Sequence, residues 1–243
     1  MNDNTPEFLK RTELLFGREK LVKIRNAHVL VLGVGGVGGY TAEMLVRAGV
    51  GELTIVDGDI VEASNLNRQL AALHSTENQP KTEVLKKRFL DINPDCIIHD
   101  IFEYMEDDKI EKLLENHFDY AVDAIDSLSP KVYFLKNCLE RNIPVISSMG
   151  SGGRIDPFAI KIADISKTYN CGLARAVRSK LKKLGIAKGI KTVFSDENVP
   201  PEAVFAYTDE NGYNHSMTGT ISYTVAIFGC ILASEVIRDL IKN

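Results

Sequence analysis

The stretch that decides the fold is His28-Val29-Leu30-Val31-Leu32-Gly33-Val34-Gly35-Gly36-Val37-Gly38. Its first five residues form a largely apolar run, which is typical of a parallel strand buried on both faces. The glycines that follow have G-x-G-x-x-G spacing, and residues 40–48 then show helical spacing without a breaker. Glycine permits a tight turn and a close backbone approach to phosphate, and the helix start offers free N–H groups. We therefore predict a nucleotide site at Gly33, Gly35, Gly36 and Gly38; a purely structural glycine turn is the alternative.

Strand and helix signals alternate through the first 150 residues. The expected strands are 28–32, 52–57, 96–101, 120–126 and 143–147, and the expected helices are 8–26, 40–48, 80–93, 107–115 and 131–141. Strands that are joined by helices form right-handed βαβ units and a parallel sheet. The pattern predicts a Rossmann-like, doubly wound α/β fold whose sheet is mostly parallel.

The pattern changes after residue 150. Residues 154–168 predict an antiparallel extension of the sheet, and residues 195–216, rich in Pro, Glu, Asp and Asn, predict a loop. The apolar stretch from Met217 to Ile241 predicts a buried closing helix; a membrane span is the disfavoured alternative because hydroxyl side chains interrupt the stretch. We expect one domain over 1–243, divided into a nucleotide-binding core (8–165), a basic and loop insertion (166–216) and a C-terminal helix (217–243).

Composition is typical of a soluble globular protein. The chain has 243 residues, of which 44% are apolar and 26% charged, and a formal net charge of −4. This length and composition fit one large α/β domain. The acidic balance argues against a dedicated nucleic-acid coat protein, but it leaves room for a local basic patch. The polar N-terminus has no segment of signal-peptide type, so we expect a cytoplasmic protein without a membrane anchor.

The four cysteines, at 96, 138, 171 and 230, form no CxxC pair. A zinc knuckle of the usual spacing is therefore not expected, and we predict no zinc. We interpret all four as free thiols that are buried or partly buried in a reducing compartment, with Cys230 in the core side of the closing helix.

An acid and two cations follow the glycine turn. Asp57 ends the second expected strand about 20 residues past the last glycine, where a ribose-binding acid is placed in dinucleotide folds. This much fits a dehydrogenase as well as an ATP enzyme. Arg68 and Lys81 favour ATP, because two cations near a phosphate-binding turn suit a triphosphate better than a pyrophosphate. Taken singly, Arg68 in a surface ion pair and Lys81 as a solvated helix-start residue are the alternatives.

The fourth expected strand ends in Asp123-Ala124-Ile125-Asp126. In a doubly wound sheet, ligands bind beyond the carboxyl ends of the strands. Mg²⁺ that bridges phosphates needs few protein ligands, so one carboxylate is sufficient. We assign Asp126 to Mg²⁺ and Asp123 to capping the following turn.

A further set of motifs completes this pattern in chain order. The set is Arg11, the Gly33–Gly38 turn, Asp57-Gly58-Asp59, Ser64-Asn65-Leu66-Asn67-Arg68-Gln69, Gln79-Pro80-Lys81, Ile92-Asn93-Pro94 and Asp123-Ala124-Ile125-Asp126. Over roughly residues 8–165 the chain thus resembles the ubiquitin-activating-like superfamily that includes ThiF, MoeB and HesA. The resemblance implies binding of ATP and Mg²⁺ and adenylation of a carboxylate.

The resemblance also implies roles for individual residues. It assigns ATP contacts to Arg11, Asp57, Asp59, Asn65, Arg68 and Lys81, the metal to Asp126, and catalysis to Arg68, Lys81 and Asp126. Within this set Asp57 matches the ribose-binding acid. Arg11 matches an arginine that reaches the partner subunit's ATP in homodimeric members, so a homodimer is implied.

The later half resembles one branch of that superfamily, the tRNA threonylcarbamoyladenosine dehydratases. The matching stretches are Ser148-Met149-Gly150-Ser151-Gly152-Gly153-Arg154-Ile155-Asp156-Pro157 and Ile162-Ala163-Asp164-Ile165-Ser166-Lys167-Thr168. The branch implies that ATP activates the threonyl carboxylate of a modified adenosine beside the anticodon. A carbamoyl nitrogen of the same molecule then closes a cyclic hydantoin, with formal loss of water. Such intramolecular attack needs no enzyme nucleophile, which suits a chain without an obvious Cys–His pair.

The basic segment is the candidate contact for tRNA. Seven Lys and Arg residues and no acid lie between Cys171 and Ser195. We expect Arg175, Arg178, Lys182 and Lys183 to contact the phosphate backbone; a solvated helix face is the alternative. Cys171 stands where some activators carry a catalytic thiol, and an ordinary cysteine is the alternative there.

Three other functions compete with a cyclodehydratase. The first is an activator of a ubiquitin-like sulfur carrier, with a cysteine desulfurase and sulfur-acceptor system as partner; the missing zinc cysteines disfavour it. The second is a nicotinamide-dependent oxidoreductase, which has no need of Arg68, Lys81 and Asp126 together. The third is a catalytically silent binding module, against which the intact acids and bases argue.

Overall fold

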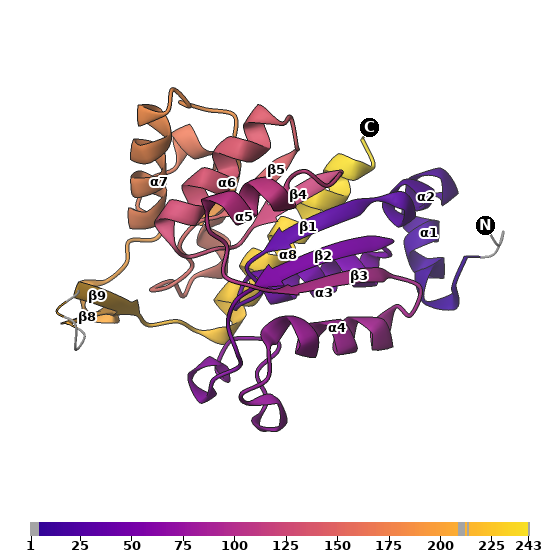
Figure 1. Cartoon of the computed structure of the whole chain (residues 1–243), viewed down its shortest axis with the longest axis horizontal. Coiled ribbons are helices and arrows are strands. Elements are labelled where there is room, and N and C mark those ends of the chain that lie inside the picture. Colours follow the sequence, from indigo (N-terminus) through magenta and orange to yellow (C-terminus); the bar gives the residue numbers. More distant parts are fainter. Residues whose placement is uncertain (1–4, 209–211, 213, 243) are drawn as a thin grey trace.

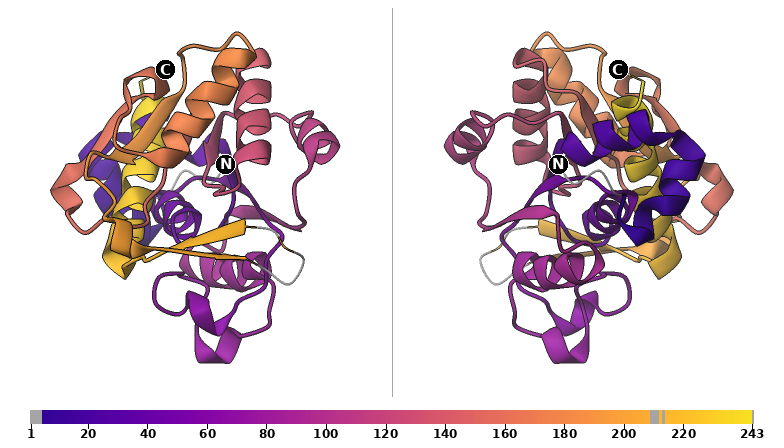
Figure 2. Two further views of the ribbon diagram at one scale, coloured as in Figure 1. Left: turned by 90° about the vertical axis from the view of Figure 1, so that its left-hand side faces the viewer. Right: turned by 90° about the vertical axis from the view of Figure 1, so that its right-hand side faces the viewer.

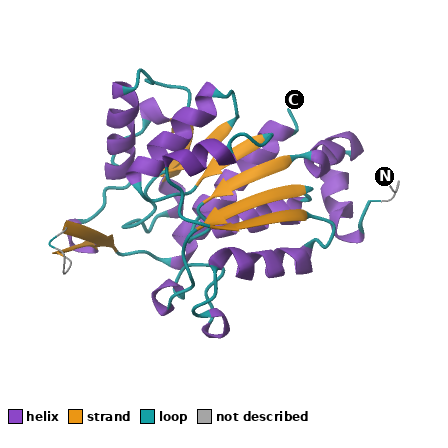
Figure 3. Ribbon diagram, in the orientation of Figure 1, coloured by secondary structure: helices purple, strands orange, loops and turns teal. Residues whose placement is uncertain are grey.

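The computed structural model describes residues 5–208, 212 and 214–242, and shows helices on both faces of one large sheet (Figures 1 and 3). The strands of this sheet are β1 (His28–Leu32), β2 (Glu52–Asp57), β3 (Ile97–Phe102), β4 (Tyr120–Asp123), β5 (Val145–Ser148), β6 (Ile160–Asp164) and β7 (Lys191–Ser195). The helices are α1 (Lys10–Phe16), α2 (Arg18–Asn26), α3 (Gly38–Ala48), α4 (Lys81–Ile92), α5 (Asp107–Leu113), α6 (Leu128–Glu140), α7 (Gly172–Lys183) and α8 (Ser222–Leu240).

The strand order is β3-β2-β1-β4-β5-β7-β6. All neighbours pair in parallel except β6, which runs antiparallel to β7. The order reverses at β1, whose two neighbours β2 and β4 follow it in sequence on opposite sides. The predicted doubly wound fold with an antiparallel extension is confirmed, and the glycine turn follows the strand at which ligands bind in such folds.

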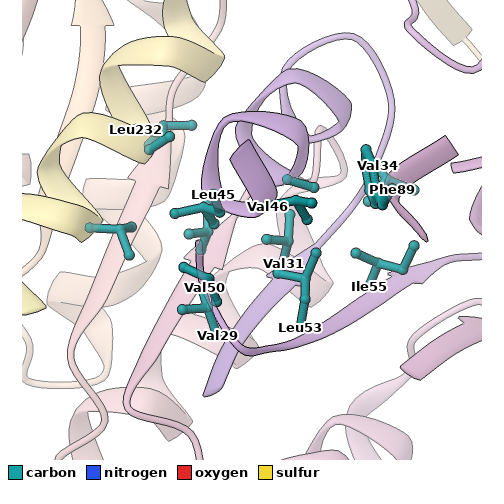
Figure 4. Packing of buried hydrophobic residues seen from close by; sticks show 14 of the residues in the cluster. Val29, Val31, Val34, Leu45, Val46, Val50, Leu53, Ile55, Phe89 and Leu232 are labelled. Carbon is teal, nitrogen blue, oxygen red and sulfur yellow. The ribbon is translucent and has the colours of Figure 1, made fainter. Parts of the chain in front are cut away.

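Alternate residues of β1 supply two separate cores. Val29 and Val31 face the layer that contains α3, α4 and α8, whereas Leu30 and Leu32 face the layer that contains α5, α6 and α7. Figure 4 shows Val29 and Val31 beneath the helices that carry Leu45 and Leu232. This two-sided burial explains why β1 reads as a continuous apolar run rather than as an alternating one.

Helix α8 lies directly on α3. A Cβ atom at Gly229 would lie 2.6 Å from the carbonyl oxygen of Val37 and 2.8 Å from the Cβ of Tyr40. The Thr41 hydroxyl donates a hydrogen bond to the Gly229 carbonyl at 3.3 Å. The predicted closing helix is therefore a core helix. Its close contact with α3 is possible because residue 229 is a glycine and has no side chain. None of the helices among the described residues has both the length and the apolarity that a bilayer crossing requires.

The N-terminal helix is interrupted where one helix was expected. A 3-10 turn (Glu7–Leu9) leads into α1, and α2 starts only after Gly17, whose φ of 83° ends α1. Glycine adopts this backbone conformation readily, so the chain turns there at little cost.

Strand β7 was not expected from the sequence. Its short buried core, Thr192-Val193-Phe194, follows the basic segment and carries little periodicity.

The loop predicted for 195–216 is wrong. A second, two-stranded sheet pairs β8 (Val204–Thr208) with β9 (Asn214–Thr218) in antiparallel fashion. The Pro, Glu, Asp and Asn residues that favoured a loop lie mainly outside β8, whose five residues, Val-Phe-Ala-Tyr-Thr, are all exposed and show no alternation of buried and exposed positions. Since β9 extends to Thr218, the terminal helix begins at Ser222 rather than at Met217.

The interpretation of Cys230 as a core residue is also wrong. Cys96, Cys138 and Cys171 are buried free thiols, whereas Cys230 is exposed on α8. The buried positions of α8 include Phe228, Leu232 and Val236, which recur at helical spacing and leave 230 on the opposite side.

Substitution of Gly229 by Ala should test the α3–α8 contact. The added Cβ meets backbone atoms that cannot rotate away, so the helices must separate. We expect the free energy of unfolding, measured by chemical denaturation, to fall by about 1–3 kcal/mol. Cys230→Ala, at the neighbouring exposed position, is the control and should change it by less than about 0.5 kcal/mol. Equal stability of the two variants would contradict the contact.

Candidate functional site

The glycine turn is fixed by its own backbone. Gly33 has a φ of 85°, and a Cβ there would lie 2.9 Å from the carbonyl carbon and oxygen of Ala124. A Cβ at Gly38 would lie 1.8 Å from the carbonyl oxygen of Gly33. These two glycines are therefore required for the turn to close and to pack against the loop that follows β4.

The other two glycines leave space outside the turn. The atoms nearest to a Cβ at Gly35 or Gly36 belong to side chains, Gln69 Nε2 at 3.7 Å and Val225 Cγ2 at 3.4 Å. No side chain caps the start of α3, and its first turn contains no acid. The backbone N–H groups of a helix start bind anions when they have no internal partner. The backbone at Gly35 and Gly36 is thus approached only by side-chain atoms, which is the environment that an anion-binding glycine turn requires.

Asp57 ties the glycine turn to the loop after β2. Its Oδ2 accepts a hydrogen bond from the Val34 N–H at 2.8 Å, and its Oδ1 accepts one from the Asp59 N–H at 2.9 Å. Burial raises the pKa of Asp57, although the charge of Lys81 and the two N–H groups oppose that rise. Each carboxylate oxygen accepts more than one hydrogen bond, so Asp57 retains capacity for a ribose hydroxyl.

Lys81 is buried at the start of α4, which rules out a solvated helix-start residue. Its side chain is 4% exposed, and Nζ lies 2.7 Å from Asp59 Oδ2. The Tyr104 hydroxyl donates to Asp59 Oδ1 at 2.8 Å, and a Cβ at Gly58 would lie 2.5 Å from the Tyr104 ring. Burial would raise the pKa of Asp59, but the hydrogen bonds from Lys81 and Tyr104 outweigh burial and lower it. Asp59 is therefore the anionic anchor of Lys81.

Arg68 has neutral partners. Its Nη1 donates to the Ser64 carbonyl at 2.8 Å and to Asn67 Oδ1 at 2.9 Å. Among the described residues no acid pairs with it, so the surface ion pair that was its alternative does not form there. Asn65, which is buried, accepts from the Glu62 N–H at 3.2 Å and so fixes the start of this loop. In the part of the chain that the structure describes, the positive charge of Arg68 has only these neutral partners. The next residue, Gln69, lies against the glycine turn, with Nε2 3.7 Å from a Cβ built at Gly35.

A cavity of about 490 Å³ lies between this loop and the β8–β9 hairpin. Arg68 and Asn67 line one wall, and Phe205 and Met217 line the other. Asn67 Nδ2 donates to the Thr220 carbonyl at 3.1 Å, which joins the two walls. Figure 1 shows the hairpin beyond the carboxyl ends of the parallel strands, and Figure 2 shows it from two further directions. The cavity combines a cation, the acid Glu202, an amide and exposed apolar side chains, so it offers polar and apolar contacts to an organic ligand.

A buried ion pair supports the loop after β4. Asp123 and Lys131 are both 0% exposed, with Nζ 2.7 Å from Oδ2. Asp123 Oδ1 also accepts from the Ile125 N–H at 3.1 Å, which confirms its assignment to the turn, and Lys131 donates to the Ile125 carbonyl at 2.7 Å. Asp126 is exposed, and its neighbour in the loop, Ser127, donates to it at 3.4 Å. Its carboxylate thus stays accessible beside the glycine turn.

Helix α7 presents part of the basic segment to solvent. Ala174, Val177 and Leu181 face the core, and Arg175, Lys182 and Lys183 are exposed. Arg178 differs from these three, because its Nη1 donates to the carbonyl and the hydroxyl of Thr168. In Figure 1, α7 and the hairpin lie toward the same end of the molecule.

Cys171 and Arg11 both lie apart from the glycine turn. Cys171 is buried, and its Sγ caps α7 by accepting from the Ala174 N–H at 3.4 Å, which favours an ordinary structural cysteine. Arg11 is exposed on α1, at the amino ends of the strands, so within one chain it does not approach the glycine turn (Figure 1).

Sequence reasoning missed Tyr104, Lys131 and Phe205. Lys131 follows Asp123 by eight residues and lies in the first turn of α6, but nothing in the sequence indicates that its ammonium turns back into the core. Tyr104 and Phe205 are exposed aromatic residues in segments without a motif. An exposed aromatic beside a polar loop is a weak signal for a site, because isolated exposed apolar residues are common.

Comparison with known proteins gives one family. The model of the ThiF family matches residues 9–243. The tRNA threonylcarbamoyladenosine dehydratase of Bacillus subtilis (strain 168) is 40% identical over 240 residues, which cover 96% of this chain and 94% of that protein. The enzyme of the same name from Haemophilus influenzae is 36% identical, over 94% of this chain and 91% of that protein. The structure of E. coli tRNA N6-threonylcarbamoyladenosine dehydratase, TcdA, in complex with ATP superposes with a TM-score of 0.88 at 32% identity, over 97% of this chain and 94% of that chain.

Lys131→Met should test the buried pair. The substitution leaves the Asp123 carboxylate buried without its cation, and removal of one partner of such a pair costs about 3–5 kcal/mol of stability. Lys136→Met on the same helix is the matched control, because Lys136 makes an exposed pair with Glu140 that is worth at most about 1 kcal/mol. Chemical denaturation of both variants measures the difference; equal losses would mean that the buried pair does not support the loop.

Proposed function

The chain belongs to the ThiF family, and on that basis we propose that it is a tRNA threonylcarbamoyladenosine dehydratase. It uses ATP to activate the threonyl carboxylate of the modified adenosine next to the anticodon, and the ring then closes to the cyclic hydantoin. Near full-length similarity to two bacterial dehydratases supports the substrate. The observation in the structure that carries the proposal is that Arg68 lines the cavity under the hairpin, while the next residue, Gln69, lies against Gly35 of the glycine turn.

The glycine turn and the residues around it form the proposed ATP site. The N–H groups at Gly35 and Gly36 and the start of α3 bind phosphate, and Asp57 binds the ribose. Asn65, Arg68 and Lys81 contact the phosphates. Lys81 keeps one donor on Asp59 and has two more to offer, since an ammonium carries three. Asp59 acts within this site as the anchor of Lys81.

Asp126 is the proposed magnesium residue. Its carboxylate is exposed in the loop after β4, and one of its oxygens accepts a hydrogen bond from the Ser127 hydroxyl. The carboxylate oxygens of Asp126 can therefore bind a metal ion from the solvent side. Mg²⁺ commonly binds through one or two carboxylates together with phosphate oxygens. When bound, the ion supplies charge that neutralises the phosphates.

The chain's own residues then bind and orient the reactants. A threonyl carboxylate oxygen attacks a phosphorus atom of ATP and forms an acyl phosphate anhydride. The phosphoanhydride bond to that phosphorus breaks, and the remainder of the nucleotide leaves as pyrophosphate or ADP. Arg68 and Lys81 stabilise the charge that develops on the phosphate oxygens. The carbamoyl nitrogen of the same nucleoside attacks the activated carbonyl, loses its proton and expels the phosphate group. Because both reacting groups belong to one molecule held in one cavity, proximity replaces an enzyme nucleophile.

The exposed face of α7 is the proposed contact for the tRNA backbone. Arg175, Lys182 and Lys183 are free to reach phosphates, and Arg178 belongs to the same set although it already donates to Thr168. Such contacts position the substrate and weaken as salt rises. An enzyme of this class acts where tRNA is, so we place it in the cytoplasm.

A homodimer accounts for the N-terminal helix. Leu14 and Leu15 are 87% and 76% exposed on α1, next to Arg11. Neighbouring exposed apolar residues mark an interaction surface more often than a solvated one. We propose that α1 packs against a second copy and that Arg11 contacts the ATP of that copy.

The division of the chain into a nucleotide-binding core (8–165), an insertion (166–216) and a C-terminal helix (217–243) stays a prediction.

Incubation with ATP, Mg²⁺ and tRNA that carries the linear modification tests the function. Mass spectrometry of the nucleosides should show loss of one water. Arg68→Ala and Asp126→Asn should each lower turnover about 100-fold or more without lowering the melting temperature. Asp108→Asn, at an exposed acid of α5, is the control and should keep full turnover. An unchanged nucleoside, with adenylation of a sulfur-carrier protein that works with a cysteine desulfurase, would favour the alternative function.

Phe205 tests the substrate cavity. Its ring is 63% exposed and stacks on Tyr207 with centroids 6.2 Å apart and planes at 17°. A base that stacks on an aromatic residue gains about 1–3 kcal/mol. Phe205→Leu should therefore raise the KM for the modified tRNA about tenfold while the affinity for ATP stays constant, and Phe205→Trp should restore the KM. Phe158→Leu, at an exposed phenylalanine outside the cavity lining, is the control; an equal effect in that variant would argue against the cavity.

A further inference from the structure

A second cluster of polar side chains lies at the opposite end of the sheet. β1 begins with His28 and β2 begins with Glu52, and these two residues pair in register. His99 on β3 pairs with Thr54. Since side chains alternate along a strand, all four project from the same face of three neighbouring strands. This face is otherwise apolar, with Leu30, Val56 and Ile101 as the next residues along the three strands.

Two histidines converge on one carboxylate. His99 Nε2 lies 2.8 Å from Glu52 Oε1, and His28 Nδ1 lies 3.6 Å from the same oxygen. The three ligand atoms all lie within 4.8 Å of one another. Tetrahedral zinc with nitrogen and oxygen ligands at 2.0–2.1 Å places those ligands roughly 3.3 Å apart. The two separations from Glu52, 2.8 and 3.6 Å, lie on either side of that value, and the third pair lies within 4.8 Å, so side-chain shifts of about 1 Å bring all three groups within reach of one ion.

Thr54 orients the ring of His28. The Thr54 hydroxyl and His28 Nε2 lie 2.8 Å apart, and Thr54 is buried, so this hydrogen bond holds the ring in place. The Nδ1 to Glu52 distance of 3.6 Å is too long for a hydrogen bond. When Nε2–H donates to Thr54, the lone pair of Nδ1 therefore points at the Glu52 carboxylate. A cation between Nδ1 and the carboxylate would remove the repulsion between them. A hydrogen bond to the far nitrogen is the usual support of a histidine ligand.

The surroundings favour the neutral, ligating form of His28. Burial lowers the pKa of His28, and the nearby His99 adds to that effect, while Glu52 and Asp119 oppose it. The edge of the Phe118 ring covers His28, with centroids 4.7 Å apart. His99 and Glu52 are partly exposed, so an ion has access from solvent. His117 pairs with Asp119 beside the cluster at 3.3 Å.

We propose that His28, Glu52 and His99 bind one divalent transition-metal ion of the zinc class. Two imidazoles and a carboxylate suit zinc, and three protein ligands leave a fourth position for water. The site uses no cysteine, so the absence of CxxC pairs does not bear on it. The ion joins β1 and β2 to β3, the outermost strand of the sheet. It lies at the start of β2, roughly 16 Å along the strand from the nucleotide-binding end.

Metal binding by tag-free protein tests this site. Equilibrium dialysis against Zn²⁺ should show one ion per chain, and titration with Co²⁺ should give the visible absorption bands of a tetrahedral site. Zn²⁺ at about 100 times its Kd should raise the melting temperature by roughly 5 °C. His99→Ala and Glu52→Gln should each remove the bound ion and the rise in melting temperature. His99 is partly exposed, so its replacement keeps the fold intact.

His74→Ala is the matched control. His74 also lies beside an acid, Glu77, at 3.1 Å, but it is exposed. It does not belong to the cluster of His28, Glu52 and His99. This variant should bind Zn²⁺ as the unmodified chain does. Less than one ion per chain in the unmodified protein, or undiminished binding in His99→Ala, would overturn the proposal. The affinity for ATP should stay constant in all these variants, so the result is independent of the proposed tRNA activity.

Discussion

The close approach of the glycine turn to the loop after β4 is the constraint on which the site depends. A side chain at Gly38 would meet the carbonyl of Gly33, and one at Gly33 would meet the backbone of Ala124. The turn therefore brings the start of α3 and the loop with Asp126 to one place, beyond the carboxyl ends of β1 and β4. Asp57 adds the loop after β2 to this arrangement through the Val34 N–H. The proposed contacts of the glycine turn to phosphate, of Asp57 to ribose and of Asp126 to the metal depend on this arrangement, whereas Lys81 and Arg68 are held by side-chain hydrogen bonds of their own.

The charged groups around the turn fall into two kinds. Lys81 and Lys131 are buried, and each is neutralised by one acid, Asp59 and Asp123. Pairs of this kind hold loops in position, and a buried charge without its partner is costly. Arg68 and Asp126 have no opposite charge among the described residues. Their charges therefore remain available to a ligand, which separates the groups that shape the site from the groups that act in it.

The sequence predicts the parallel core well because each of its signals is local. A strand buried on both faces is apolar throughout, as at β1, and the glycine spacing marks the turn that follows it. The hairpin β8–β9 was missed because β8 is exposed along its whole length and carries no hydrophobic alternation, and β7 was missed because few residues define it. The partners of Lys81 and Lys131 depend on where side chains meet in three dimensions. The same is true of His28, Glu52 and His99, which lie on three different strands.

The contact between Gly229 and α3 has a consequence for the hairpin. Helix α8 is held against the same helix that begins at the glycine turn, and residues 219–221 are all that separates it from β9. Helix α8, to which the hairpin is attached, is thus held in a fixed position relative to the glycine turn. Movement of the hairpin away from α8 involves rotation within those three residues, and Thr220, one of them, accepts the hydrogen bond from Asn67 in the Arg68 loop. Movement of the hairpin and the conformation of the loop that carries Arg68 are thus coupled through this hydrogen bond.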